Sequence, residues 1–86
     1  MAYKTVNPYT NEVVKEYPDA TADQVENALT ETHKLFKKWE QEGPETRADQ
    51  LHEIASLMRE DSDHLATVMV TEMGKLFREA KGEVEL

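Results

Sequence analysis

Residues 21–44, TADQVENALTETHKLFKKWEQEGP, decide how this chain folds. Side chains at steps of three and four form one mainly apolar stripe: Val25, Ala28, Leu29, Thr32, Leu35, Phe36 and Trp39. An α-helix has 3.6 residues per turn, so these side chains share one face. Thr21 and Gln24 have the spacing of a capping box, and Gly43-Pro44 supplies a stop. We predict a helix over about 22–42.

Upstream of this helix lie two short runs of β-prone residues, at positions 3–6 and 13–17. The residues between them, 7–12, are of the types that turn the backbone. Asn11 is the candidate for a left-handed position, because a short polar side chain tolerates positive φ better than most. We predict a β-hairpin over 3–17.

Downstream, three further helices are predicted, over about 45–60, 63–73 and 76–86. Pro44 suits a first helical turn, Ser62 is taken as the N-cap of the next helix, and Gly74 closes it. Periodicity alone leaves a strand open for residues 65–70, but the flanking caps favour a helix. The fold class is therefore α+β, a hairpin followed by about four amphipathic helices. The last helix meets the chain end without a stop, which indicates a longer protein.

Composition restricts the function classes. The 86 residues carry 18 acidic and 10 basic side chains, a net charge of -8 that repels a phosphate backbone, so no nucleic-acid partner is expected. Only 38% of residues are hydrophobic, which places an independent fold near the margin of stability. The absence of cysteine excludes disulfides and thiol catalysis within these residues.

No apolar run approaches the length of a bilayer span, and residues 1–5, MAYKT, lack the hydrophobic centre of a signal peptide. We therefore expect no membrane association and a cytoplasmic location.

Several side chains invite a sharper function, and each also has a plainer explanation. His52 and Glu53 begin like a zinc-protease helix, but Ser56 stands where the second histidine is required. His33 and His64 lie too far from His52 in sequence to form a short-range ligand pair, so we expect no metal site. The many carboxylates alternate with lysine and arginine on the polar helix faces, which is typical of solvated surface.

Phe36 and Trp39 could stack on a ligand, but they continue the apolar stripe and are expected to pack in a core or a subunit contact. Lys75 after Gly74 could hold an anion at a helix start, although one glycine and one lysine fall far short of a phosphate loop. Ser62 after an aspartate suits the attachment site of a small acidic carrier protein, whereas the capping role needs no modification.

The two ends of the chain carry the most specific pattern. Residues 71–75 are TEMGK and residues 79–84 are EAKGEV, and this segment resembles the aldehyde dehydrogenase superfamily. Residues 6–13, VNPYTNEV, resemble the N-terminal hairpin of that family, and Arg47, Ala48 and Leu51 fit its second helix. Residues 26–29 and 72–75, with Phe36 and Trp39, look most similar to the succinate-semialdehyde dehydrogenase branch.

Two positions depart from the family pattern. Asn11 stands where glycine is usual, and Leu76 stands where proline commonly follows the Gly-Lys pair. Asparagine can adopt the turn conformation and leucine is acceptable at a helix start, so both departures are compatible with the fold.

The resemblance implies that residues 1–86 are the outer N-terminal part of the α/β cofactor-binding domain of a longer enzyme. Such an enzyme oxidises an aldehyde through a cysteine nucleophile, passes hydride to NAD or NADP, and hydrolyses the resulting thioester. The family's cysteine, glutamate, asparagine and glycine-containing cofactor loop belong to later segments. The chain alone is therefore expected to be inactive and to carry no catalytic or cofactor-binding residue.

The resemblance also bears on metals and partners. Some family members hold a monovalent cation with a backbone carbonyl near the position of Val6, but the other ligands come from later residues, so no metal site is assigned. The partners it implies are the remainder of the dehydrogenase chain and further copies in a homo-oligomer. The alternative from the residues alone is a self-contained small acidic helical protein that binds a partner or carries a prosthetic group on Ser62.

Overall fold

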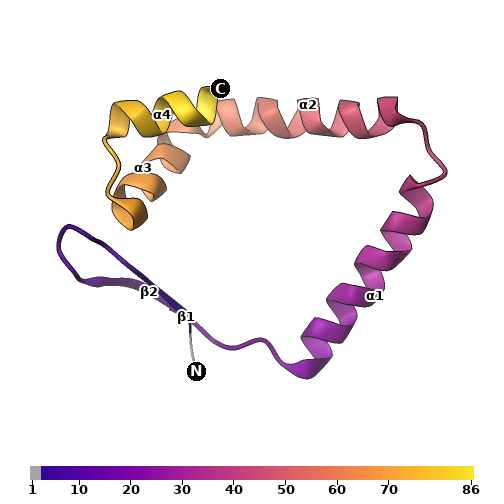
Figure 1. Ribbon diagram of the computed structural model, residues 1–86, viewed down its shortest axis with the longest axis horizontal. Helices are drawn as coiled ribbons and strands as arrows, with labels where there is room; N and C mark the ends of the chain where they lie inside the picture. The colour runs from indigo at the N-terminus through magenta and orange to yellow at the C-terminus, as the bar shows by residue number, and fades with distance from the viewer. Residues whose placement is uncertain (1–2) are drawn as a thin grey trace.

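The computed structural model describes residues 3–86 (Figure 1). Met1 and Ala2, which begin the stretch compared above with a signal peptide, lie outside the described residues. The elements in chain order are β1 (Tyr3–Val6), β2 (Val13–Tyr17), α1 (Ala22–Trp39), α2 (Pro44–Glu60), α3 (Ser62–Met73) and α4 (Phe77–Glu85). The predicted α+β class, a hairpin followed by four helices, is confirmed.

The hairpin owes its shape to the turn between its strands. β1 and β2 pair antiparallel, with a bulge where the register shifts between Thr5 and Val6. The Asn7 side-chain oxygen accepts the Tyr9 N–H at 2.9 Å, and the Asn11 N–H donates to the Asn7 carbonyl at 2.7 Å. Asn11 has φ 61°, so the predicted left-handed position is confirmed. The polar side chains of the loop therefore replace the glycine that a tight turn commonly uses.

Helix α1 begins as predicted but ends earlier. The Thr21 hydroxyl accepts the Gln24 N–H at 3.1 Å, and the Gln24 side chain accepts the Thr21 N–H at 2.9 Å, which completes the capping box. The helix ends at Trp39 rather than at about residue 42. Beyond it, the N–H groups of Gln41 and Glu42 donate to carbonyls only three residues back, so the chain tightens out of the α-helix before Gly43.

The junction of α2 and α3 differs from the prediction. Pro44 occupies the first turn of α2, but Ser62 is not an N-cap: it is the first residue of α3 and is buried. Asp61 is the N-cap and makes no side-chain capping bond. Its N–H donates to Leu57 and its carbonyl accepts from Leu65, so one residue serves as the end of one helix and the start of the next. An N-cap residue needs a non-helical backbone, and because Asp61 takes that position, Ser62 already lies inside the helix.

The C-terminal elements follow the sequence closely. Residues 65–70 lie within α3, so the strand alternative is wrong. Gly74 ends α3, as predicted, and it adopts the left-handed conformation, with φ 74° and its N–H donating to the Val70 carbonyl. Leu76 is the N-cap of α4 with extended backbone, and the helix begins at Phe77, one residue later than expected.

The core is small and lies between α3 and α4. Ala66 and Ala80 are fully buried, and Val84 and Ser62 are 8% exposed. The four helices and the hairpin otherwise form an open frame, in which α1 and α2 meet at a corner, α3 turns toward the hairpin and α4 runs back beside the end of α2 (Figure 1). The frame measures 48 × 35 × 14 Å, so it is little thicker than one helix. Within residues 3–86, no helix combines the length and hydrophobicity that a bilayer span requires.

Candidate functional site

The hairpin turn lies against the turn between α3 and α4. A Cβ atom placed on Gly74 would lie 3.1 Å from Cγ of Pro8. Gly74 thus has two roles, because it adopts positive φ and leaves room for the proline ring. The two most recognisable segments, near residues 6–13 and 71–75, meet at this point although they stand at opposite ends of the chain.

Two ion pairs stabilise the α3–α4 region. Lys75 pairs with Glu83 across the start of α4, and Lys81 Nζ donates to Asp63 Oδ1 at 2.9 Å. Lys75 therefore already has a carboxylate partner, which weakens its candidacy as an anion site.

The hydrogen bond and the charge of the Asp63 carboxylate raise the pKa of Lys81 above its ordinary value of 10.5. Because the pKa is raised in the folded state, the stabilisation from Lys81 is fully present below pH 10.5. It is lost only as the pH rises through the raised value, and it is small because the group lies at the surface.

Arg47 fixes the corner between α1 and α2. Its Nη1 atom donates to the Trp39 carbonyl at 3.0 Å and to the Glu42 carbonyl at 3.3 Å. The Trp39 carbonyl also accepts the Glu42 N–H at 3.1 Å, so the guanidinium adds a second hydrogen bond at this helix end and bridges the turn to α2. From the sequence, Arg47 is only a residue that fits the second helix of the family. Its hydrogen bond to the Trp39 carbonyl, eight positions earlier, produces no periodic pattern from which it could be predicted.

Replacement of Arg47 by alanine is expected to lower the free energy of unfolding of the intact protein by about 1 to 2 kcal/mol, since two hydrogen bonds to a charged donor are lost. Chemical denaturation would measure the change. Arg59→Ala in the last turn of α2 is the control and should change stability by less than about 0.5 kcal/mol. Equal effects of the two substitutions would contradict the bridging role.

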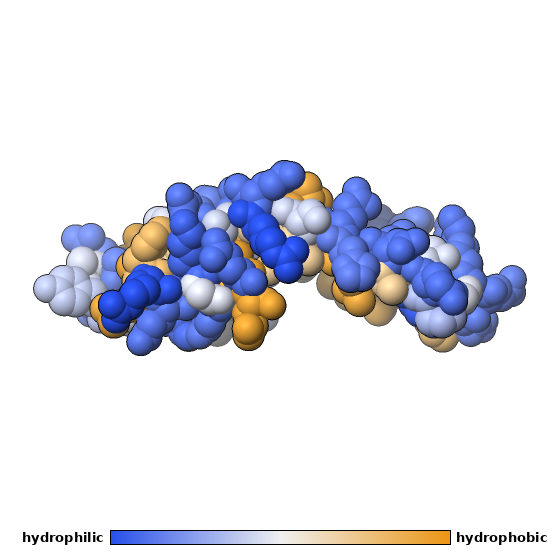
Figure 2. Space-filling model, turned by 90° about the horizontal axis from the view of Figure 1, so that it is seen from above, coloured by the Kyte–Doolittle hydropathy of each residue, from blue (hydrophilic) through white to orange (hydrophobic). Residues whose placement is uncertain are grey.

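A groove of about 480 Å³ lies on the apolar stripe of α1 where it approaches α2. Thr32, Leu35, Phe36, Trp39, Glu40 and Arg47 line it. Trp39 is half-buried and Phe36 is 56% exposed, so the predicted core packing of these aromatic residues is absent within residues 3–86. The stripe is a mainly apolar face, and no second layer formed by residues 3–86 covers it. Figure 2 shows hydrophobic side chains interrupting the hydrophilic surface of the thin frame.

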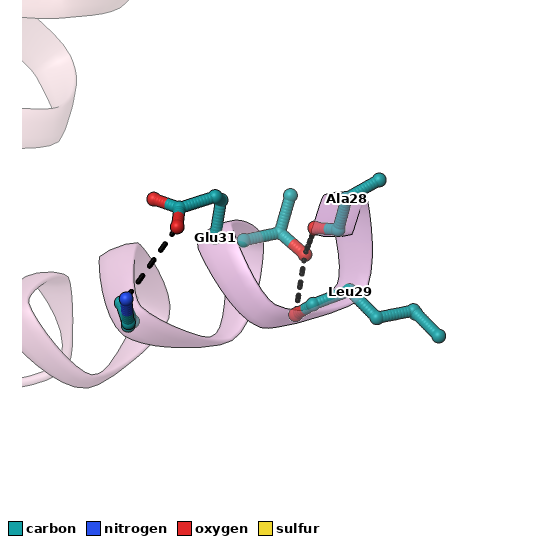
Figure 3. Close-up of polar contacts among 5 residues, drawn as sticks. Ala28, Leu29 and Glu31 are labelled. Carbon is teal, nitrogen blue, oxygen red and sulfur yellow. Dashed lines mark hydrogen bonds and ion pairs between the residues drawn. The ribbon is translucent and has the colours of Figure 1, made fainter. Parts of the chain in front are cut away.

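The one hydroxyl in this groove is already satisfied by its own helix. Thr32 Oγ1 donates within reach of the Ala28 and Leu29 carbonyls, at 2.7 and 3.2 Å (Figure 3). On the neighbouring polar face, Glu31 pairs with Lys34 at 3.4 Å (Figure 3). The groove therefore offers mainly apolar contact and little specific hydrogen bonding.

The remaining candidate residues are not brought together. Within the described residues no group of three or more histidine, cysteine or acidic side chains has the arrangement of a metal site. His33 lies near Phe36, with ring centroids 6.3 Å apart, on the surface of α1. Ser62, the proposed carrier attachment point, is only 8% exposed, so a prosthetic arm would have to disrupt the helix packing to be attached there.

Comparison with known proteins agrees with this architecture. The model of the aldehyde dehydrogenase family matches residues 1–86. A succinate-semialdehyde dehydrogenase [NADP(+)] from Deinococcus radiodurans is 40% identical over 84 residues, which are 98% of this chain and 18% of that protein. A 3,6-anhydro-alpha-L-galactose dehydrogenase from a Vibrio species is 35% identical over 96% of this chain and 17% of its own length.

A solved structure has the same arrangement of elements. The succinic semialdehyde dehydrogenase of Streptococcus pyogenes, crystallised with NADP+ as the cofactor, superimposes with a TM-score of 0.86 at 45% identity. The superposition covers 99% of this chain and 19% of that one, so the chain spans less than a fifth of the length of the relatives it matches. On sequence and fold together, this chain belongs to the aldehyde dehydrogenase family.

Proposed function

We propose that the protein carrying this segment is an NADP-dependent succinate-semialdehyde dehydrogenase. It would oxidise the aldehyde, with water, to the carboxylic acid while NADP+ is reduced to NADPH. The observation that carries this proposal is the match along the whole chain, in sequence and in fold, to enzymes named for that activity. The segment would be the N-terminal portion of the cofactor-binding domain, over residues 1–86.

Within that enzyme, the role of residues 1–86 would be architectural. The sequence contains no cysteine to act as the nucleophile, and the lysines of the α3–α4 region, Lys75 and Lys81, are paired with Glu83 and Asp63. We therefore place no catalytic, cofactor-binding or metal-binding residue here. What the segment supplies is a hairpin fixed to α3 at Gly74 and a corner fixed by Arg47.

Succinate semialdehyde is favoured over other aldehydes because the Deinococcus and Streptococcus proteins, at 40% and 45% identity, are both named for it. The Vibrio relative at 35% identity is named for an anhydrosugar, so the choice of substrate depends on residues outside this segment. NADP is favoured over NAD because those two names specify it.

A direct assay tests the proposal. The intact protein carrying this N-terminal sequence is isolated, its mass is measured, and cofactor reduction is followed with succinate semialdehyde and, for comparison, 3,6-anhydrogalactose, each with NADP+ and NAD+. The proposal predicts a mass several times that of 86 residues and the highest kcat/KM with succinate semialdehyde and NADP+. An intact mass equal to that of the 86-residue chain, or an absence of aldehyde oxidation, would overturn it.

Assembly and location belong to the same proposal. We expect a homo-oligomer in the cytoplasm, which light scattering of the intact enzyme and cell fractionation would test. A self-contained binding or carrier protein is disfavoured, because the frame is open and Ser62 is buried.

A further inference from the structure

We draw no further inference here: the strongest candidate, the two partly exposed ion pairs on the surface of the α3–α4 region, Lys75 with Glu83 and Lys81 with Asp63, belongs to the helix contact already described and points to no ligand or partner beyond it.

Discussion

Aspartate in place of Ala66 is expected to lower the free energy of unfolding of the dehydrogenase by about 3 to 5 kcal/mol. Ala66 is fully buried on α3 against α4, where Ala80 is also fully buried. A carboxylate there would be both oversized and without a countercharge, and neither water nor a basic side chain could reach it without separating the two helices. We expect most of the variant to be insoluble or unfolded at physiological temperature.

Thermal and urea denaturation of the intact enzyme would measure this effect. His64→Asp is the matched control, because it places the same side chain on the same helix at an exposed position. That control should change stability by less than about 0.5 kcal/mol, since an acid near the start of a helix is tolerated. An Ala66→Asp enzyme as stable as the control would show that α3 and α4 do not pack as described.

Valine in place of Gly74 is expected to lower the free energy of unfolding by about 2 to 4 kcal/mol, from backbone strain and from crowding against Pro8. A β-branched residue is strained at φ 74°, which accounts for roughly 1 to 2 kcal/mol. Its Cβ would also lie 3.1 Å from Cγ of Pro8, and the extra methyl groups would press on the proline ring, so the hairpin would have to move away from α3. Denaturation would show the loss, and hydrogen exchange would show faster opening of the hairpin.

Gly82→Ala provides a control of opposite sign. Gly82 lies inside α4, and a Cβ there would meet no atom within 4 Å. Alanine at a helical position should therefore stabilise the enzyme by about 0.5 to 1 kcal/mol. Destabilisation by Gly82→Ala would mean that the remainder of the chain approaches α4 at this glycine. If Gly74→Val left the stability unchanged, the argument that position 74 requires glycine for its positive φ would be wrong.

Features that depend on neighbouring residues were predictable from the sequence. The capping box at Thr21, the left-handed Asn11 and the stop at Gly74 all depend on local backbone geometry, and all three are confirmed. Ser62 was misplaced because one residue, Asp61, ends α2 and begins α3, and no spacing rule distinguishes that junction from an ordinary cap. The end of α1 was missed by three residues for a related reason, because the turn tightens before Gly43.

The site features that the sequence did not predict are tertiary. The amphipathic pattern of α1 indicates which face avoids water, but it cannot show that no layer of this chain lies against that face. The contact between Pro8 and Gly74 joins residues that are far apart in sequence. The Arg47 bridge joins a side chain to backbone carbonyls, and because every residue has a carbonyl, no residue type in the sequence marks the acceptor. Family resemblance marked these positions without giving the contacts that explain them.

The single-layer frame has a consequence for how the dehydrogenase is made. Its main contacts, within the hairpin and between α3 and α4, join elements adjacent in sequence, so they can form soon after the segment leaves the ribosome. In a chain as long as the matched relatives, about five times the length of this segment, synthesis of the rest would take tens of seconds at about 5 to 20 residues per second. During that interval the apolar stripe of α1 would stay exposed on the nascent chain, at a stage when the hairpin and the α3–α4 core could already be formed.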